Sequence, residues 1–212
     1  RNSAYLGDQQ LPAGIEAFPD MKTAVMGADA TLLAVPSAGI REMARAMWPL
    51  SSPSMPVVIC AKGIEPNTGL LLSDVVRAEM PGQPVAALSG PTFADEVAAD
   101  LPSTVTIAAE LAVDERLEDG LAARLALSLS AGSFRAYVSD DLTGVEIGGA
   151  MKNVIAIACG ISRGAGFRAN MTAALITRGL AEMTQLATKL GGSADTISGL
   201  SGLGDLTLTC SS

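Results

Sequence analysis

Three segments of this sequence place a single charged residue among small or apolar neighbours, where it could do chemistry. Lys62 directly follows an apolar, β-branched run, and a lysine there is costly to desolvate unless an anion or a dipole faces it. Lys152 lies just after the small residues at 148–150, and a lysine in low dielectric loses its proton more readily, which makes it usable as a base. Asp205 is the single charge in the Gly-rich segment 199–206 and could hold an ammonium group or accept a hydrogen bond from a substrate hydroxyl.

Each of these residues also has an ordinary structural interpretation, and spacing alone leaves both open. Lys62 could extend to the surface, Lys152 could lie at the polar edge of a helix that packs through its glycines, and Asp205 could cap the next helix. The turn at 89–94 is equally ambiguous. Its Gly90 permits a close backbone approach and its Thr92 supplies a hydroxyl, but Gly-Pro is common in turns.

Histidine is absent from the 212 residues, and this removes several mechanisms at once. Ser-His-Asp triads, histidine proton shuttles and histidine-liganded metals are excluded, so acid–base work must fall to Lys, Asp, Glu, Tyr or Cys. The three cysteines, Cys60, Cys159 and Cys210, lie far apart without a C-x-x-C pair. We therefore expect reduced structural thiols, with neither a disulfide framework nor a metal site.

The charge balance of the chain bears on its partners. A formal net charge of −8, from 14 basic and 22 acidic residues, argues against nucleic acid or an anionic membrane as the main partner. An anion could still bind at a focused local site. Because no uninterrupted apolar segment approaches the roughly 18 residues that a membrane span needs, we predict no membrane span.

Short apolar runs that alternate with helical patterns must position the charged residues. Strands are predicted at 31–35, 57–60, 85–88, 104–108 and 134–138, and helices at 40–48, 70–78 and about 114–129. Such alternation predicts an α/β fold with a parallel sheet covered on both faces, which binds ligands at the carboxyl ends of its strands. After Asp140 the strand runs disappear and the pattern becomes helical. We therefore place a boundary there, between domains 1–140 and 141–212.

Six segments, in order along nearly the whole chain, resemble the bacterial type of NAD(P)-dependent glycerol-3-phosphate dehydrogenase. They are V-P-S at 35–37, A-K-G-I-E at 61–65, S-G-P-T-F-A at 89–94, G-G-A-M-K-N-V-I-A-I at 148–157, T-A-A-L-I-T-R-G-L-A-E-M at 172–183 and G-L-G-D-L-T-L-T-C at 202–210. The resemblance implies a Rossmann-type NAD(P)-binding domain followed by an all-helical substrate domain, with the active site between them. It also implies a cytoplasmic enzyme that interconverts sn-glycerol 3-phosphate and dihydroxyacetone phosphate with NAD or NADP, for glycerophospholipid synthesis.

The resemblance assigns roles to particular residues. It implies that Lys152 is the proton acceptor and that Lys62 contacts both cofactor and substrate. The residues implied to bind the small phosphorylated polyol substrate are Lys62, Gly90, Thr92, Lys152, Asn153, Asp205 and Thr209. The resemblance implies that Asn153 and Thr209 are polar neighbours of the reacting carbon. The implied cofactor contacts are Lys62 and Ala94.

Two features of the family are absent from these residues. The G-x-G-x-x-G turn that cradles the cofactor pyrophosphate is expected upstream of Arg1, together with the residue that would discriminate NAD from NADP. The Ser-Arg-Asn segment that would hold the substrate phosphate is expected beyond Ser212. We therefore expect an incomplete chain, the middle of an enzyme.

Two alternatives to this interpretation stay open. One is another β-hydroxyacid-type dehydrogenase, although such families commonly place an Asn one helical turn beyond the catalytic Lys, whereas Asn153 is adjacent to it. The other is a non-catalytic helical dimerisation fragment. Whichever interpretation holds, we expect a homodimer, which the apolar helical part could support.

Overall fold

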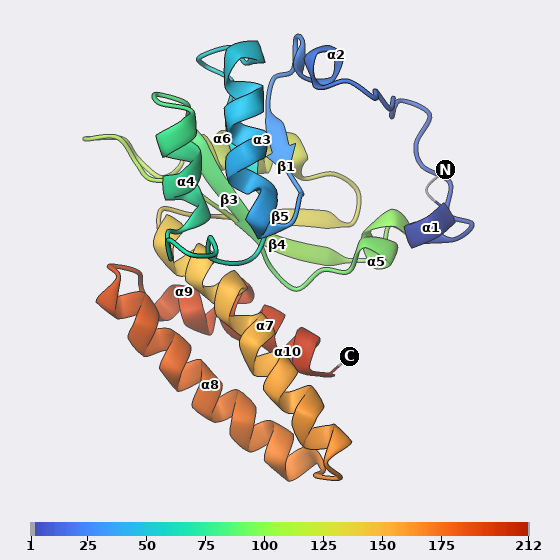
Figure 1. Cartoon of the computed structure of the whole chain (residues 1–212), viewed down its shortest axis with the longest axis vertical. Helices are drawn as coiled ribbons and strands as arrows, with labels where there is room; N and C mark the ends of the chain where they lie inside the picture. Colours follow the sequence, from blue (N-terminus) through green and yellow to red (C-terminus); the bar gives the residue numbers. More distant parts are fainter. Residues whose placement is uncertain (1–2, 212) are drawn as a thin grey trace.

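The computed structural model describes residues 3–211, in which helices flank a five-stranded sheet and a second group of helices lies against it (Figure 1). The strands are β1 (Thr31–Leu33), β2 (Val57–Ile59), β3 (Val85–Ser89), β4 (Ser103–Ala108) and β5 (Phe134–Ser139). The helices associated with the sheet are α1 (Ser3–Leu6), α2 (Met21–Val25), α3 (Ile40–Met47), α4 (Leu72–Glu79), α5 (Ala94–Ala98) and α6 (Leu121–Leu129), with short 3-10 turns η1 (Ser37–Gly39) and η2 (Trp48–Leu50). The second group consists of α7 (Leu142–Gly164), α8 (Ala169–Lys189), α9 (Ala194–Ser198), the π-helical turn η3 (Leu200–Gly204) and α10 (Asp205–Ser211).

The sheet follows the order β1-β2-β3-β4-β5 and is mixed. The pairs β1–β2, β2–β3 and β4–β5 are parallel, as predicted, but β3 and β4 are antiparallel, and the prediction of a wholly parallel sheet is wrong at this pair. The connection between them contains only the five-residue α5. A helix of that length rises about 7.5 Å, whereas five strand residues span about 17 Å. The chain therefore re-enters the sheet from the edge at which β3 ends.

All five predicted strands are present, but the helix predicted from about residue 114 begins only at Leu121. Asp114 has a φ of 63°, in the left-handed region that a right-handed helix excludes. The backbone N–H of Ala112 donates to the carboxylate of Glu115, and this local turn replaces the first helical turns. Apolar periodicity did not reveal the turn.

Both faces of the sheet are covered, as the short β-branched strands predict. One face packs against α3 and α4, through Leu33, Val57, Ile59, Val85, Ile40, Met47, Val75 and Val76. The other packs against α6, through Val58, Ala86, Ile107, Ala122, Leu125 and Ala126. The α/β fold class is thereby confirmed, and the carboxyl ends of β1, β2 and β3 are left free to carry loops.

The second group of helices begins where β5 ends, close to the predicted boundary at Asp140. Helices α7 and α8 run side by side (Figure 1) and share a core with α9 and α10 that includes Ile155, Met183, Ile197 and Leu206. The start of α7 also packs on the sheet, where Leu142 and Val145 contact strand residues. Within residues 3–211, α7 alone is long and apolar enough to cross a membrane by length and composition, but 56% of its most apolar stretch is buried in this core. Core helices commonly meet that criterion, so the absence of a membrane span stays a prediction.

Candidate active site

A single buried carboxylate joins two lysines from distant parts of the chain. Lys152 Nζ donates to Asp205 Oδ1 at 2.5 Å, and Lys62 Nζ donates to Asp205 Oδ2. The Asp205 side chain is 1% exposed, and the Lys152 side chain is 10% exposed. Both carboxylate oxygens accept from lysines, and Asp205 is the first residue of α10 and not the residue before it, so it does not occupy the N-cap position. Because both lysines donate to Asp205, neither simply extends into solvent.

Three separate elements position these side chains. Lys62 follows β2, Lys152 lies within α7, and Asp205 is the first residue of α10, directly after the π-helical turn. Thr209, one helical turn along α10, accepts from Lys152 Nζ at 3.1 Å and donates to the carbonyl oxygen of Asp205 at 2.7 Å. Lys62 Nζ also donates to the carbonyl oxygen of Gly90 at 3.2 Å, so β3 is tied to the same cluster.

The glycines in two of the predicted motifs permit close packing around the lysines. A Cβ at Gly148 would lie 2.5 Å from the carbonyl oxygen of Ser201, and one at Gly149 would lie 3.1 Å from Ser89 Oγ. Gly90 has a φ of 155°, and a Cβ there would lie 2.8 Å from Val105 Cα. The close approach expected at Gly90 is therefore to the backbone of β4, which fixes where its carbonyl oxygen meets Lys62.

The pKa of Lys152 lies below its ordinary value. Burial lowers the pKa of Lys152, and the neighbouring ammonium of Lys62 lowers it further, whereas the Asp205 carboxylate opposes both effects. With both lysines charged, the cluster would carry one net positive charge in a chain of net charge −8, which makes it a focused site for an anion. By contrast, burial raises the pKa of the Cys60 thiol to about 11, so that thiol stays protonated and is a poor nucleophile.

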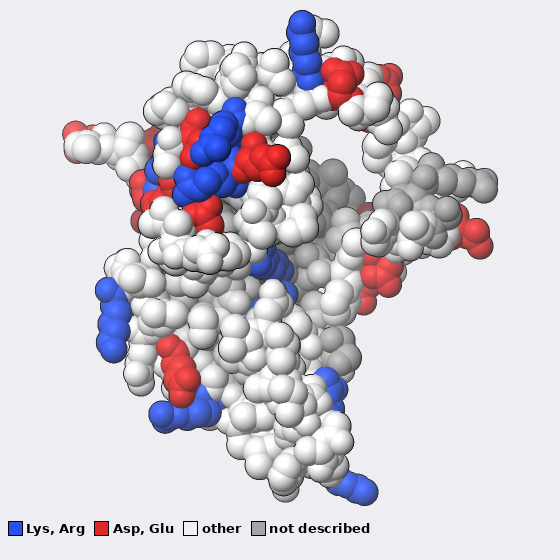
Figure 2. Space-filling model, in the orientation of Figure 1, with Lys and Arg blue, Asp and Glu red and all other residues white. Residues whose placement is uncertain are grey.

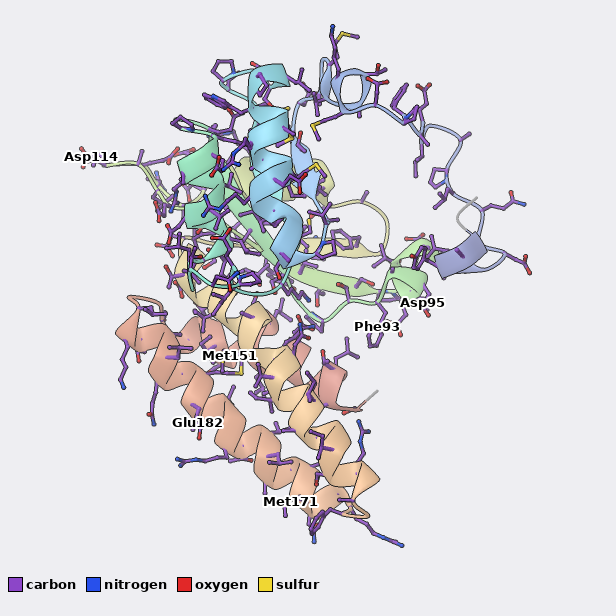
Figure 3. The ribbon with its side chains drawn as sticks, in the orientation of Figure 1. Phe93, Asp95, Asp114, Met151, Met171 and Glu182 are labelled. Carbon is purple, nitrogen blue, oxygen red and sulfur yellow. The ribbon has the colours of Figure 1, made fainter. Side chains whose placement is uncertain are left out.

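A cleft of about 970 Å³ opens beside this cluster at the strand ends. Four of the predicted site residues line it, namely Lys62, Gly90, Thr92 and Ala94. Its apolar walls come from Leu11, Pro12, Leu32, Leu88, Phe93 and Val97. Figure 2 shows Lys or Arg atoms in the hollow between the sheet and the lower helices, and Figure 3 shows Phe93 on the loop just before α5. The structure therefore brings together, around one cleft, motifs that lie far apart in the sequence.

Two residues modify the predicted set. Asn153 is exposed, because consecutive helical residues point about 100° apart and Lys152 takes the buried direction. Like Lys152, Asp205 and Thr209, Asn153 is not among the residues that line the cleft, and its role stays a prediction. Ser89 was missed. It lines the cleft and is buried, and its Oγ has no hydrogen-bond partner within residues 3–211. Its position directly before Gly90, at a predicted strand end, was the signal that could have identified it.

No group of three or more Asp, Glu or Cys side chains that could hold a metal ion occurs in the described part of the chain. Cys60, Cys159 and Cys210 are all free thiols. The charged groups of the cluster are the two lysines and Asp205, and the exposed Asp100 also lines the cleft. The site thus holds an amine against a buried carboxylate beside a cleft.

Comparison with known proteins places both halves of the chain in one family. Residues 1–113 match the family described as NAD-dependent glycerol-3-phosphate dehydrogenase N-terminus, and residues 141–212 match the corresponding C-terminus. A glycerol-3-phosphate dehydrogenase [NAD(P)+] from Brucella ovis is 49% identical over all 212 residues, which correspond to 63% of its own length. A protein of the same description from Chelativorans sp. is 46% identical, with 62% of its length covered.

Solved structures agree with this assignment. The crystal structure of glycerol-3-phosphate dehydrogenase from Coxiella burnetii superposes with a TM-score of 0.90 and 39% identity, over 99% of this chain and 62% of that one. Glycerol-3-phosphate dehydrogenase from Saccharomyces cerevisiae gives a TM-score of 0.86 and 28% identity, over 100% of this chain and 62% of that one. The chain thus spans less than two thirds of the length of these relatives.

Proposed function

The chain belongs to the NAD-dependent glycerol-3-phosphate dehydrogenase family, and on that premise we propose that it forms the central part of an enzyme interconverting sn-glycerol 3-phosphate and dihydroxyacetone phosphate. The observation that carries the proposal is the Lys62–Asp205–Lys152 cluster beside the cleft at the strand ends. Family membership favours this reaction over that of another β-hydroxyacid-type dehydrogenase. A base beside a cleft favours catalysis over a purely structural helical fragment.

In this mechanism Lys152 is the proton acceptor. Burial lowers the pKa of Lys152, which increases the fraction of neutral amine, and that form would take the proton of the C2 hydroxyl as the alcohol is oxidised. Asp205 and Thr209 fix the direction of Nζ through the bonds at 2.5 and 3.1 Å. In the reverse direction the ammonium polarises the carbonyl and returns the proton.

The substrate is a small phosphorylated polyol, and we assign its contacts to Lys62, Gly90, Thr92, Lys152, Asn153, Asp205 and Thr209. Lys62 supplies a positive charge to the lining of the cleft, which suits a phosphate ester. When Lys152 is in its ammonium form, as in reduction of the carbonyl, Asp205 neutralises one of the two lysines, so a dianionic substrate meets one net positive charge. This arrangement would attract the anion without leaving both ammonium groups buried and unpaired.

The cleft fits the nicotinamide end of NAD or NADP. Leu32, Phe93 and Val97 offer apolar walls for a flat ring, and Lys62 and Ala94 would contact the cofactor where β2 and α5 approach the cleft. When bound, the cofactor would accept or supply the hydride. A G-x-G-x-x-G turn for its pyrophosphate is not part of these 212 residues.

A chimera tests the proposed function. This chain would replace the matching residues of the Brucella ovis relative, to which it aligns over its whole length. We expect oxidation of NADH or NADPH that depends on dihydroxyacetone phosphate, and its loss when Lys152 is replaced by Met in the same chimera. A folded chimera without this activity, or one whose activity survives the loss of Lys152, would contradict the proposal.

The proposal also covers the oligomeric state of the protein, its cellular location and its metabolic role. We place the protein in the cytoplasm, as a homodimer that acts in glycerophospholipid synthesis. Val154, Ile157 and Ile161 support a dimer, because they lie on one face of α7 and are 59%, 64% and 69% exposed. Light scattering on wild type and an Ile157→Lys variant would test this assignment. A monomeric wild-type mass would contradict it.

A further inference from the structure

The loop that carries Lys62 is organised around a second charged residue, Glu65. Between β2 and α4 this segment contains no helix, and Glu65 holds it with both backbone and side chain. Its N–H donates to the carbonyl oxygen of Leu70 at 2.9 Å, and its carbonyl oxygen accepts from Gly69 at 3.1 Å. Thr68 Oγ1 donates to Glu65 Oε2 at 2.5 Å. Glu65 therefore closes the loop three residues after Lys62.

Glu65 is in turn fixed to α3 by Arg41. Arg41 Nε donates to Oε1 at 2.7 Å and Nη2 donates to Oε2 at 2.8 Å, a two-pronged pair in which the Glu65 side chain is 11% exposed. Arg41 Nη1 also donates to Glu79 of α4 at 2.5 Å, and Arg45 donates to the other oxygen of Glu79 at 2.9 Å. Figure 2 shows basic and acidic atoms gathered over α3 and α4. A paired fork within a network is held far better than an isolated surface ion pair.

We propose that the Arg41–Glu65 pair is a positioning device that holds the Lys62 loop so that the Lys62 ammonium stays against Asp205 and Gly90. A lysine side chain has much rotamer freedom to lose, and it keeps one geometry only where its backbone is fixed. Four residues of chain span at most about 14 Å, so an anchor at Glu65 restricts Lys62 directly. The positioning stands on these contacts alone, whereas its consequence for turnover rests on the proposed function.

The pair stays charged over the whole working range of pH. The hydrogen bonds that the Glu65 carboxylate accepts from Arg41 and Thr68 lower the pKa of Glu65 to about 2. Lys62 positioning should therefore be insensitive to protonation of Glu65 near neutral pH. The variants below can be compared at one pH without that complication.

The test measures how fast Lys62 reacts with an amine-acylating reagent in the 212-residue chain, read at each lysine by mass spectrometry. Glu65→Gln removes the charge and one acceptor of the fork, and we expect Lys62 to be acylated about threefold to tenfold faster, the factor of one lost hydrogen bond. Arg41→Lys keeps the positive charge but loses the fork, and it should raise the rate in the same direction. It also serves as a second variant should Glu65→Gln fold poorly.

The matched control is Glu79→Gln, which alters the same network but leaves the bonds between Arg41 and Glu65 in place. Its Lys62 rate should stay within about twofold of wild type, below the effect of one lost hydrogen bond. The exposed Lys22 and Lys189 serve as internal references in every variant. A Lys62 rate unchanged in both Glu65→Gln and Arg41→Lys would overturn the proposal. So would an equal rise in Glu79→Gln, or a rise shared by every lysine.

A kinetic measurement in the chimera separates this inference from the proposed function. We expect Glu65→Gln to raise KM for dihydroxyacetone phosphate more than it lowers kcat, because Lys62 is the displaced contact. If labelling of Lys62 rises but the parent chimera lacks dehydrogenase activity, the proposed function fails and the positioning stands. If the chimera is active but Lys62 labelling is unchanged in both variants, the positioning fails and the function stands.

Discussion

At the scale of single residues, the central feature is one carboxylate shared by two ammonium groups. Asp205 alone could not lower the pKa of Lys152, since a nearby carboxylate raises it. Burial and the charge of Lys62 lower this pKa, and together they outweigh the effect of Asp205. The cluster therefore combines a base with the group that orients it, and each of its three members has a distinct expected phenotype.

Replacing Lys152 by Ala removes the proposed proton acceptor. We expect turnover in the chimera to fall by roughly 10²–10⁴-fold, the range typical of a lost general base. Steady-state kinetics with sn-glycerol 3-phosphate measure the effect, and the exposed Lys189, replaced by Ala, is the control. Turnover near the parent value would remove Lys152 from the mechanism.

Lys62 and Asp205 should shift the pH dependence of oxidation in opposite directions. In the proposed mechanism the neutral amine of Lys152 is the active form, so kcat/KM for oxidation should rise with pH through its pKa. Lys62→Met removes a charge that lowers this pKa, and the rising limb should move to higher pH. Asp205→Asn removes the carboxylate that raises it, and the limb should move to lower pH. Shifts in the same direction, measured beside an exposed Asp195→Asn control, would contradict this account of the site.

At the scale of elements, a second buried carboxylate links α7 to α4. Glu146, six positions before Lys152, accepts from the backbone N–H of Ser73 at 2.9 Å and from Ser73 Oγ at 2.5 Å. The contact joins the helix that carries the proposed base to the start of the helix that follows the Lys62 loop. Burial raises the pKa of Glu146, and the bonds from Ser73 only partly offset that effect.

This raised pKa makes Glu146 a source of instability above acid pH. As pH rises past the ordinary value of about 4.3, the unfolded chain loses this proton before the folded chain does, so the free energy of unfolding falls until the folded pKa is passed. Gln at this position can still accept from the Ser73 N–H through its amide oxygen, and its amide NH2 can donate to Ser73 Oγ, which reverses the second bond. We expect Glu146→Gln to match wild type near pH 4 and to exceed it at pH 8, by about 1.4 kcal/mol per unit of raised pKa.

Thermal unfolding at several pH values measures this difference, with the exposed Glu42→Gln as the matched control. A Tm difference between Glu146→Gln and wild type that does not grow with pH would contradict the assignment. A Gln variant destabilised equally at every pH would show instead that the carboxylate itself is needed for packing.

At the scale of the whole molecule, the sheet is open at β1. Within the described residues β1 pairs only with β2, and Leu32 on it is 45% exposed. The cleft beside it offers a lysine and apolar walls but no glycine-rich turn of the kind that cradles a pyrophosphate. On the proposed function, the isolated chain would present one end of a dinucleotide site.

We accordingly expect the 212-residue chain to bind NADH and NADPH much more weakly than the chimera does. Calorimetric titration of both proteins provides the measurement, and the chimera is its own positive control. Micromolar affinity of the isolated chain for either dinucleotide would mean that the cofactor site lies elsewhere.

The sequence by itself determined the elements and the residue types of the site. Strands and helices follow from which residues must be buried along a short stretch, and that information is local. The turn at 112–115 escaped it because a side-chain bond to the backbone, and not apolar periodicity, decides that conformation. Motifs likewise marked Lys62, Lys152 and Asp205, while leaving a structural role open for each.

Only the tertiary structure decided that these three residues meet in one cluster. Asp205 lies 143 positions from Lys62 and 53 from Lys152, so their meeting depends on how α7 and α10 pack against the strand ends. The direction of β4 and the anchoring of the Lys62 loop by Arg41 are equally non-local. The physical reason is the same in each case: burial patterns specify a face, whereas the partner on that face is set by connection lengths and by packing between segments far apart in the chain.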